Sequence, residues 1–343
     1  MNIETELKEF TNQVNKEIQI ILQKWKKEVS EIHPRLLPFI DAFTKACIGG
    51  KRIRGFLVKK GFDLVSAIEH KDILKVAAAV EIMHTAILVH DDIIDKSPLR
   101  RGKPSLYKTF GENHYALSQA ISIADAGFFL AIQEVTRSLF LPEQKIKAIE
   151  YFTNSMKLTT LGELLDVSLS KKKGKDEQDI ITVDLLKTAQ YTFVSPLQIG
   201  AILGGGNEDM LKILALFGEN IGIAFQIQDD ILGVFGNEEK LGKSVYSDVQ
   251  EGKNTFLISY ALSHANKEQK KLLEQHYGLG SVTPEIFQNI KDVFEDTRSL
   301  AYSKKKGLEY MNAAKDCISN SMIKKTERTF FYELVSFLEE REF

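Results

Sequence analysis

The chain has 343 residues, of which 43% are hydrophobic and 27% are charged. This balance is typical of a soluble globular protein with a large core and excludes a largely disordered chain. Lysine and arginine total 45 against 47 for aspartate and glutamate, so the formal charge of −2 provides no whole-protein field for nucleic acid or an anionic membrane. Any polyanion must be bound by a local cluster of cations, and we expect no nucleic-acid partner.

The sequence also bears on compartment and domain organisation. The two cysteines, Cys47 and Cys317, have neither metal-ligand spacing nor a disulfide framework, which fits the reducing cytoplasm. The first ten residues are too charged for a signal core, and no run of about 18 uncharged apolar residues occurs. We therefore expect a cytoplasmic protein without an integral membrane segment. Because no Pro-, Gly- or Ser-rich linker interrupts the middle, we expect one domain over residues 1–343.

Helical periodicity dominates the chain. Apolar residues recur at intervals of three and four, and seven prolines leave long stretches uninterrupted, so we predict an all-α fold. The first predicted helix, within residues 1–29, is amphipathic and caps the domain or meets a partner. The other clearly predicted helices cover residues 74–95, 183–203 and 219–235. Loops are expected at residues 171–177, 204–206 and 278–284.

Two groups of aspartates stand on apolar predicted helices. Asp91 and Asp95 are four residues apart, so they project from one helical face about one turn apart. Hard oxygen ligands on a rigid face suit Mg²⁺, which leaves other positions to water and substrate phosphates. A solvated acidic face is the alternative, but uncompensated charge is unfavourable beside apolar surface. With Asp229 and Asp230 on a second helix, about three Mg²⁺ ions would neutralise one diphosphate.

Basic residues are distributed as an anion site requires. Lys51 and Arg54 follow a pair of glycines, whose missing side chains let a phosphate approach the backbone N–H groups. Arg100 and Arg101 follow the first aspartates, and guanidinium groups bind phosphate oxygens in bidentate fashion. A lone Gly-Gly-Lys-Arg cluster is more often a helix start. Lysines later in the chain are weaker signals because most lysines are merely solvated.

Together these motifs resemble the trans-isoprenyl diphosphate synthases, also called polyprenyl synthetases, over nearly the whole chain. Several motifs in this order are highly specific, unlike any one alone. The motifs are Gly49-Gly50-Lys51-Arg52-Ile53-Arg54, Glu81-Ile82-Met83-His84, His90-Asp91-Asp92-Ile93-Ile94-Asp95, Arg100-Arg101-Gly102, Gly162 to Asp166, Lys187-Thr188-Ala189, Gln226 to Asp230, and Gly242-Lys243 with Asp248 and Lys253.

The resemblance implies an isoprenoid synthase-like helical bundle around a deep central cavity, usually a homodimer. The implied ligands of Mg²⁺, for which Mn²⁺ can substitute, are Asp91, Asp95 and Asp229. Isopentenyl diphosphate would be held by Lys51, Arg54, His84 and Arg101. The allylic diphosphate would be held by Arg100, Lys187, Thr188, Gln226, Lys243 and Lys253. The catalytic set would be Lys187, Thr188, Gln226, Asp91 and Asp95, while Asp166 and Tyr191 are secondary members. For His84 a hydrogen-bonded core histidine is the alternative.

The implied reaction is the Mg²⁺-dependent head-to-tail (1′-4) condensation of isopentenyl diphosphate with an allylic diphosphate, which releases pyrophosphate. It needs no protein nucleophile, since positioning and electrostatic stabilisation of the departing pyrophosphate supply most of the rate. Two positions depart from the family pattern. Gly233 stands where a third aspartate is common, so Asp229 is expected to be the main ligand of its helix, and Glu163 stands where glutamine often follows Gly162.

Product length would depend on the residues beneath the first aspartates, which are Met83, Ala86 and Ile87. None is aromatic, whereas family members that stop at fifteen carbons commonly have an aromatic residue there. We therefore expect an all-trans product of about C20, within a range of roughly C15 to C25. The alternative is that Ala86 is only a small packing residue. The floor would then be set by Met83, Val80, Phe128 or Phe129.

Two other functions fit parts of the sequence. A class I terpene cyclase shares the implied fold and metal chemistry, but it needs no second diphosphate site. A non-catalytic subunit of a heteromeric synthase, or a helical scaffold, would tolerate loss of the aspartates. Because both the aspartates and the basic residues near them are present, the sequence favours the condensing enzyme.

Overall fold

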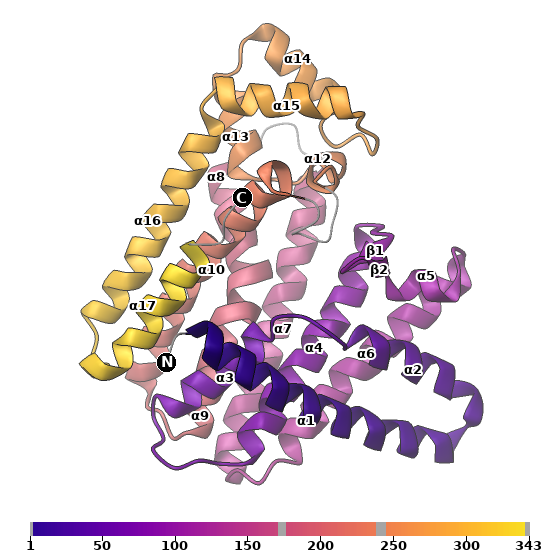
Figure 1. Cartoon of the computed structure of the whole chain (residues 1–343), viewed down its shortest axis with the longest axis vertical. Helices are drawn as coiled ribbons and strands as arrows, with labels where there is room; N and C mark the ends of the chain where they lie inside the picture. The colour runs from indigo at the N-terminus through magenta and orange to yellow at the C-terminus, as the bar shows by residue number, and fades with distance from the viewer. Residues whose placement is uncertain (1–2, 171–175, 238–244, 340–343) are drawn as a thin grey trace. The chain divides into compact units, whose positions relative to one another are not determined.

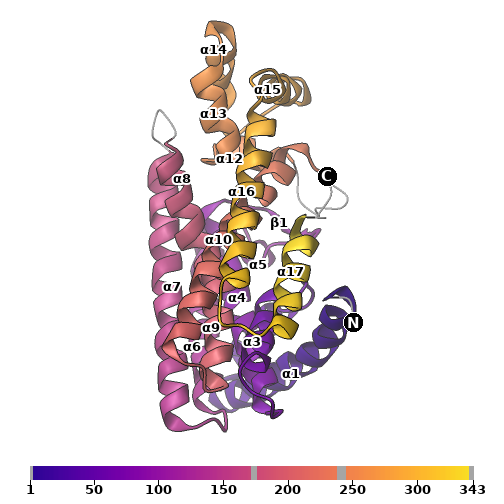
Figure 2. The same cartoon turned by 90° about the vertical axis from the view of Figure 1, so that its left-hand side faces the viewer.

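The computed structural model describes residues 3–170, 176–237 and 245–339 (Figures 1 and 2). The described part is helical apart from one pair of two-residue strands, which confirms the predicted all-α fold. The elements up to the middle of the chain are α1 (Ile3–Ile32), η1 (Pro34–Leu36), α2 (Leu37–Ala46), α3 (Ile53–Asp63), α4 (Asp72–Ile94), β1 (Leu99–Arg100), β2 (Lys103–Pro104), α5 (Leu106–Phe110), α6 (His114–Thr136), α7 (Pro142–Ser170) and α8 (Glu177–Val183). The later elements are η2 (Asp184–Val194), α9 (Ser195–Leu203), α10 (Glu208–Phe235), α12 (Ser247–Glu251), α13 (Phe256–His264), α14 (Lys267–His276), α15 (Pro284–Asp296), α16 (Ser299–Ser319) and α17 (Lys325–Glu339).

The chain folds into two compact units. Unit 1 comprises Met1–Thr153 with Pro196–Leu211, and unit 2 comprises Asn154–Ser195 with Lys212–Phe343. The long helices α7 and α10 each contribute residues to both units. The expectation of a single domain over residues 1–343 stays a prediction.

Unit 1 is built around α4, which packs against α1, α3 and α6. Its three consecutive alanines at 77–79 are fully buried, and small side chains let neighbouring helices approach closely. A second close contact joins α3 to α9. A Cβ on Gly61 would lie 2.1 Å from the Leu197 carbonyl oxygen, and one on Gly200 would lie 1.9 Å from that of Val58. No larger residue fits at this crossing without moving a helix.

The short hairpin of unit 1 follows α4 directly. Asp95 caps α4, as expected from the Ser97-Pro98 sequence behind it, and β1 then pairs with β2 in antiparallel fashion. Both central residues of the turn are left-handed, with φ of +53° at Arg101 and +70° at Gly102. This is the backbone of a type I′ turn, in which glycine is ordinary and arginine is unusual. The fold therefore keeps a strained backbone conformation at Arg101, a residue that the sequence analysis assigned to the binding of isopentenyl diphosphate.

Unit 2 contains the unusual helical segment η2. The predicted helix at residues 183–203 is present, but its Asp184–Val194 part is a π-helix, which is wider than an α-helix and is often found at functional sites. Three glycines lie against it. A Cβ on Gly162 would lie 2.6 Å from the Lys187 backbone nitrogen, one on Gly222 would lie 2.5 Å from the Ala189 Cα, and one on Gly218 would lie 2.9 Å from Val194 backbone atoms. The wide helix therefore fits only because its neighbours lack side chains at these points.

The remaining helices of unit 2 form a cluster on α16, which packs against α13, α15 and α17. Buried aromatic and branched residues fill this cluster, among them Val249, Ile290 and Phe294. The predicted loop at residues 278–284 is confirmed, since Gly278 and Gly280 have left-handed backbones and Pro284 begins α15. Of the loop expected at residues 171–177, positions 171–175 lie outside the described residues, and Glu177 already begins α8.

Helix boundaries were predicted best where the sequence carries a stop signal. The structure places α4 two residues ahead of the predicted start, and α1 extends three residues beyond the predicted end. The helix predicted at residues 219–235 is α10, which starts at Glu208. Three described helices, α4, α6 and α10, are long and apolar enough by length and composition alone to cross a membrane. In α4, 67% of the most apolar window is buried inside the protein.

Candidate active site

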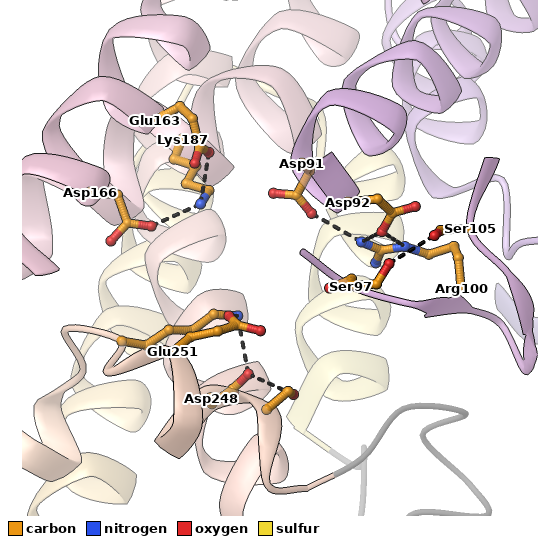
Figure 3. Close-up of polar contacts among 12 residues, drawn as sticks. Asp91, Asp92, Ser97, Arg100, Ser105, Glu163, Asp166, Lys187, Asp248 and Glu251 are labelled. Carbon is orange, nitrogen blue, oxygen red and sulfur yellow. Dashed lines mark hydrogen bonds and ion pairs between the residues drawn. The ribbon is translucent and has the colours of Figure 1, made fainter. Parts of the chain in front are cut away.

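In unit 1 the first aspartates are bound by an arginine from the hairpin (Figure 3). The Arg100 Nε donates a hydrogen bond to Asp92 Oδ1 at 2.8 Å, and its Nη2 donates to Asp91 Oδ2 at 3.1 Å and also contacts Asp92. Asp92 is only 3% exposed, and burial raises the pKa of its carboxyl to about 6 although Arg100 opposes the shift. A cation is therefore needed where these carboxylates converge, and Arg100 supplies one.

The residues present fit a divalent metal by the chemistry of their donors. Asp91 and Asp95 offer carboxylate oxygens one helical turn apart at the end of α4, which is the donor type that Mg²⁺ prefers. The guanidinium of Arg100 forms ion pairs with Asp91 and Asp92, so a positive charge is stable beside these carboxylates. Within the described ranges, no three His, Cys, Asp or Glu side chains gather around one point. The aspartates therefore suit a metal that is held jointly with a substrate phosphate.

The predicted isopentenyl diphosphate residues in unit 1 include a half-buried histidine, His84. The Arg54 Nη1 lies 3.1 Å from His84 Nε2, although the two residues are 30 positions apart. Burial, and then the positive charge of Arg54 followed by Arg101 and Arg100, lowers the pKa of His84 well below its ordinary value. His84 is therefore a neutral imidazole amid cations. It is hydrogen-bonded and half-buried, and it lies among the cations of the basic cluster.

The glycine pair shapes the same cluster. Gly49 and Gly50 have φ of +87° and +95°, a conformation that side chains rarely adopt. A Cβ on Gly50 would lie 2.9 Å from Arg101 Nη2, so a larger residue would push the guanidinium away. Arg101 also donates a 3.1 Å hydrogen bond to the Ile48 carbonyl. Lys51, between the glycines and α3, is exposed.

One residue of this motif has a structural role that the sequence analysis did not assign. Arg52 is buried, and its guanidinium donates to Asn15 Oδ1 at 2.8 Å and to the Cys47 carbonyl at 2.6 Å. It also forms a buried pair with Glu81 at 3.5 Å, and Glu81 accepts from the Gly55 N–H at 2.8 Å. This network fixes the loop that carries Lys51 and Arg54. The only signal in the sequence was an arginine among glycines and other basic residues.

In unit 2 the predicted catalytic lysine is held by two carboxylates. The Lys187 Nζ lies 2.8 Å from Glu163 and 2.8 Å from Asp166, as Figure 3 shows. Glu163 is one of the two departures from the family pattern, and it adds a negative charge where a glutamine would be neutral. The other secondary member, Tyr191, is buried on η2. The lysine is thus oriented in a strongly acidic setting.

A polar chain links two further predicted residues of unit 2. The Thr188 hydroxyl donates to Gln226 Oε1 at 2.8 Å, and the Gln226 amide donates to Asp230 Oδ1 at 2.8 Å. Burial, followed by the charge of Asp248, raises the pKa of Asp230 to about 8. Asp229, the predicted metal ligand beside it, is half-buried. The threonine and glutamine are therefore locked together, as a role near one reacting group requires.

The sequence analysis missed one buried acid, Asp184, which begins η2. It is 4% exposed, and within the described residues its Oδ2 has no hydrogen-bond partner. Burial, followed by the charge of Asp230 and then Asp166, raises its pKa well above the ordinary value. Its only signal was an aspartate inside the apolar stretch that leads to Lys187. It adds to the excess of carboxyl groups around the lysine.

The remaining predicted residues differ in how the structure places them. Lys253 forms an ion pair with Asp248 at 3.1 Å and lies 3.7 Å from Glu251. Lys243 lies outside the described residues. Met83 and Ala86 are buried in α4, whereas Ile87 is half-buried. Phe129 is 72% exposed on α6, and its role in setting the chain length stays a prediction.

A cavity of about 890 Å³ lies within unit 1, between α4 and the hairpin. Thr85, Val89 and Asp92 line it from one face of α4, and Arg100 and Arg101 line it from the hairpin. The other walls come from α2 and α5 and are largely apolar. The hairpin arginines therefore border an open space and not a packed core.

Comparison with known proteins gives one family. The family model for polyprenyl synthetase matches residues 38–295 of this chain. A geranylgeranyl diphosphate synthase of Saccharolobus solfataricus is 35% identical over 78% of this chain and 78% of its own length. That of Sulfolobus acidocaldarius is 32% identical over 90% of this chain and 92% of its own length. A crystal structure of geranylgeranyl pyrophosphate synthase from Corynebacterium glutamicum, complexed with isoprenyl diphosphate and magnesium, superposes with a TM-score of 0.91 at 26% identity and covers 98% of this chain and 99% of that one.

Proposed function

This chain belongs to the polyprenyl synthetase family, and from that premise we propose how its residues carry out the reaction. It is a prenyltransferase with the all-α isoprenoid synthase fold. It joins isopentenyl diphosphate head to tail to an allylic diphosphate and elongates the chain to geranylgeranyl length, about C20. The observation that carries the assignment of a condensing enzyme is the basic cluster of unit 1, because a second diphosphate needs a site of its own.

Isopentenyl diphosphate is held by the basic cluster of unit 1. Several guanidinium groups lie near His84, and their mutual repulsion is relieved when a dianionic or trianionic diphosphate binds. His84 stays neutral there, so it can donate or accept one hydrogen bond without adding charge. The cluster members are Lys51, Arg54, His84 and Arg101.

The allylic diphosphate is held through divalent metal together with cations. When bound, Mg²⁺ neutralises the diphosphate and makes it a better leaving group. The proposed ligands are Asp91, Asp95 and Asp229, for about three ions, with Mn²⁺ as a substitute. The proposed cationic contacts are Arg100, Lys187, Lys243 and Lys253. Arg100 then exchanges a carboxylate partner for a phosphate oxygen.

The chain's own residues position the reacting groups. Lys187 is oriented by Glu163 and Asp166, so its ammonium stays in place as negative charge develops on the departing pyrophosphate. Thr188 and Gln226, bonded to each other, place oxygen dipoles beside the developing allylic cation. The double bond of isopentenyl diphosphate attacks the allylic cation, so the site needs no protein nucleophile. The resulting cation then loses a proton to the departed pyrophosphate, and this loss forms the new double bond.

Product length is read by α4 beneath Asp91. Ile87 is half-buried one turn before Asp91, and Ala86 beside it is small. Neither side chain blocks a hydrocarbon of geranylgeranyl length, and pocket depth is the property that discriminates methylene counts. Together with Met83, these residues are the proposed determinants of chain length.

We further propose that the enzyme acts as a cytoplasmic homodimer. On α6, Ile121 is 41% exposed and Phe129 is 72% exposed, so one face of this helix presents apolar surface that a second copy would cover. The apolar character of α4 serves the protein core and not a bilayer, because its Glu81 is buried in a pair with Arg52.

One assay tests the proposal. The purified protein is incubated with Mg²⁺, isopentenyl diphosphate and one of several allylic diphosphates, and the hydrolysed products are sized by chromatography. We expect an all-trans C20 alcohol, and no product when either Mg²⁺ or isopentenyl diphosphate is omitted. Cyclised hydrocarbon formed without isopentenyl diphosphate would support a terpene cyclase. No product with any primer would indicate a non-catalytic subunit.

A further inference from the structure

The cavity of unit 1 lies on a face of α4 that the proposed reaction does not use. Thr85, Val89 and Asp92 line it, and they stand four and three residues apart, so they share one helical face. Ile87, a proposed determinant of chain length, lies about 200° around the helix from Thr85, because an α-helix has about 3.6 residues per turn. The cavity and the path proposed for the product are therefore on opposite sides of α4.

The cavity is elongated along α2, whose lining residues run from Pro38 to Ala46. At one end, the Arg101 guanidinium of the hairpin donates a 3.1 Å hydrogen bond to the Ile48 carbonyl, just after α2. At the other end, Phe39 near the start of α2 meets Phe110 at the end of α5, with ring centroids 5.3 Å apart. Because the 10 residues of α2 rise about 15 Å, the cavity has room for an extended chain.

The cations that line the cavity gather at its hairpin end. Lys45 comes from the last turn of α2, and the others come from the hairpin, namely Arg100, Arg101 and Lys103. Burial, followed by the positive charge of Arg52 and then Arg100, lowers the pKa of Arg101, so positive charges crowd together here. An anion at this end would relieve their repulsion.

The two acids of the lining do not cancel this charge. Asp92 pairs with Arg100 and so offsets only one of the cations. Asp41 pairs with the Lys26 ammonium of α1 at 2.6 Å, and Lys26 is not among the lining residues. The hairpin end is therefore net positive and suits an anionic group.

Away from the hairpin the lining is largely apolar. The apolar residues come from all three helices and include Pro38, Ala42, Leu88, Val89 and Leu106. Protein interiors leave few voids larger than a water molecule, so the walls of a cavity of about 890 Å³ lack contacts that a hydrocarbon would supply. This volume falls in the range of small-molecule sites, roughly 300–1,000 Å³.

We propose that this cavity is a second binding site, which takes an anionic lipid with a single hydrocarbon chain. The head group binds Lys45 and Lys103 beside Arg101, and the chain lies along α2 toward the pair of Phe39 and Phe110. Prenyl diphosphates and fatty acids share this chemistry. The site follows from the shape and charge of the cavity and is independent of the proposed reaction.

Two substitutions fill the cavity from different walls. Ala42→Phe, at a half-buried position of α2, and Thr109→Trp, at an exposed position of α5, each block the path of the chain. Ala313→Phe, at a half-buried alanine of α16, is the matched control. Ile87→Phe is the control for the product path on the other side of α4. Lys103→Gln removes one cation from the head-group end.

The readout is isothermal titration calorimetry of the full chain with EDTA present, so that binding through a metal is absent. The probes are farnesyl diphosphate, laurate and inorganic pyrophosphate. We expect the wild type, Ala313→Phe and Ile87→Phe to bind farnesyl diphosphate equally well. Ala42→Phe and Thr109→Trp should bind it about tenfold or more weakly, because a ring occupies the space of the chain.

The other measurements separate head group from chain. Lys103→Gln should weaken the binding of farnesyl diphosphate roughly three- to tenfold, because a charged hydrogen bond is lost. Inorganic pyrophosphate should bind roughly a hundredfold more weakly than farnesyl diphosphate, since it buries no hydrocarbon. Ala42→Phe should keep the wild-type kcat in the condensation assay, and melting temperatures check that each variant is folded.

The laurate titration identifies the source of the lipid. Laurate binding that is lost in the same variants would show that acyl lipids use the site, whereas binding of farnesyl diphosphate alone would assign it to prenyl diphosphates. Three results would overturn the proposal: no binding of either lipid by the wild type, wild-type affinity in both Ala42→Phe and Thr109→Trp, or an equal loss of affinity in Ile87→Phe. If Ala42→Phe does not fold, Thr109→Trp decides. If the lipids bind as expected but no prenyl product forms, the proposed function fails while this site stands.

Discussion

The two units present opposite electrostatic problems. In unit 1, cations crowd around His84, and burial together with their charge lowers the pKa of the imidazole and keeps it neutral. In unit 2, carboxyl groups crowd together, and burial with mutual repulsion raises the pKa of Asp184 and Asp230. The basic cluster around His84 is therefore stabilised by an incoming anion, whereas the buried acids of unit 2 are stabilised by an incoming cation. This difference fits one reaction that needs both a bare diphosphate and a metal-bound diphosphate.

The two acids of the second aspartate segment can be ranked by mutation. The largest loss of turnover is expected at Asp229. Asp229→Ala should abolish turnover, by roughly a thousandfold or more, because a metal ligand is lost. Asp230→Ala should reduce kcat far less, since Asp230 is buried and hydrogen-bonded to Gln226. Steady-state kinetics at saturating Mg²⁺ measures both. The reverse order would break the assignment of Asp229 as the main ligand.

The basic cluster of unit 1 should affect one substrate only. Arg54→Gln should raise KM for isopentenyl diphosphate roughly ten- to hundredfold, because a charged hydrogen bond to phosphate is lost, and should leave KM for the allylic diphosphate unchanged. Lys59→Gln on the same helix is the matched control, since its ammonium pairs with Asp63 on the surface. An equal rise in both KM values would contradict the assignment of Arg54 to isopentenyl diphosphate alone.

The length of the product tests the role of the α4 residues that precede Asp91. Ile87→Phe should shorten the product with little change in melting temperature, because Ile87 is only half-buried. Ala86→Phe should also shorten it but should lower the melting temperature, because Ala86 is 0% exposed and a phenyl ring overpacks the core. Ile68→Phe, at a site that is 79% exposed, is the control. Unchanged chain length on chromatography in both variants would count against the assignment.

The smallest expected effect is on the pH dependence of stability. Burial raises the pKa of Asp230 from 3.8 to about 8 in the metal-free protein. Between these values the folded state keeps a proton that the unfolded chain releases, so the free energy of unfolding falls as the pH rises. Asp230→Asn removes this contribution and should flatten the fall between about pH 5 and pH 8 in denaturant titrations. An equally steep fall in the variant would show that Asp230 is not the group responsible.

Much of the fold was available from local sequence. The α4 helix was predicted within two residues because apolar periodicity ends at Ser97-Pro98, a strong stop signal. The start of α10 was missed by eleven residues, although Asn207 followed by Glu208 and Asp209 is a helix-start signal. The π-helical form of η2 was not predicted, because it depends on three distant glycines that make room for a wider helix.

The candidate site divides in the same way. Ordered motifs identified Arg54, His84, Lys187, Thr188 and Gln226, and the structure joins Arg54 to His84 and Thr188 to Gln226. The sequence also marked Gly233 and Glu163 as departures from the family pattern. It could not show what each departure does, since this depends on which side chain lies opposite.

The sequence by itself determined the helical class, the family and the residue types of the reaction, because these follow from periodicity and from motifs read in order. Only the tertiary structure decided how the charges are partnered. Glu163 meets Lys187, Arg100 meets the first aspartates, and Asp248 lies against Gly233 through contacts between separate elements of the chain. Electrostatic energies depend on the distances between charges and on their burial, and neither quantity can be read from the motifs of the sequence alone.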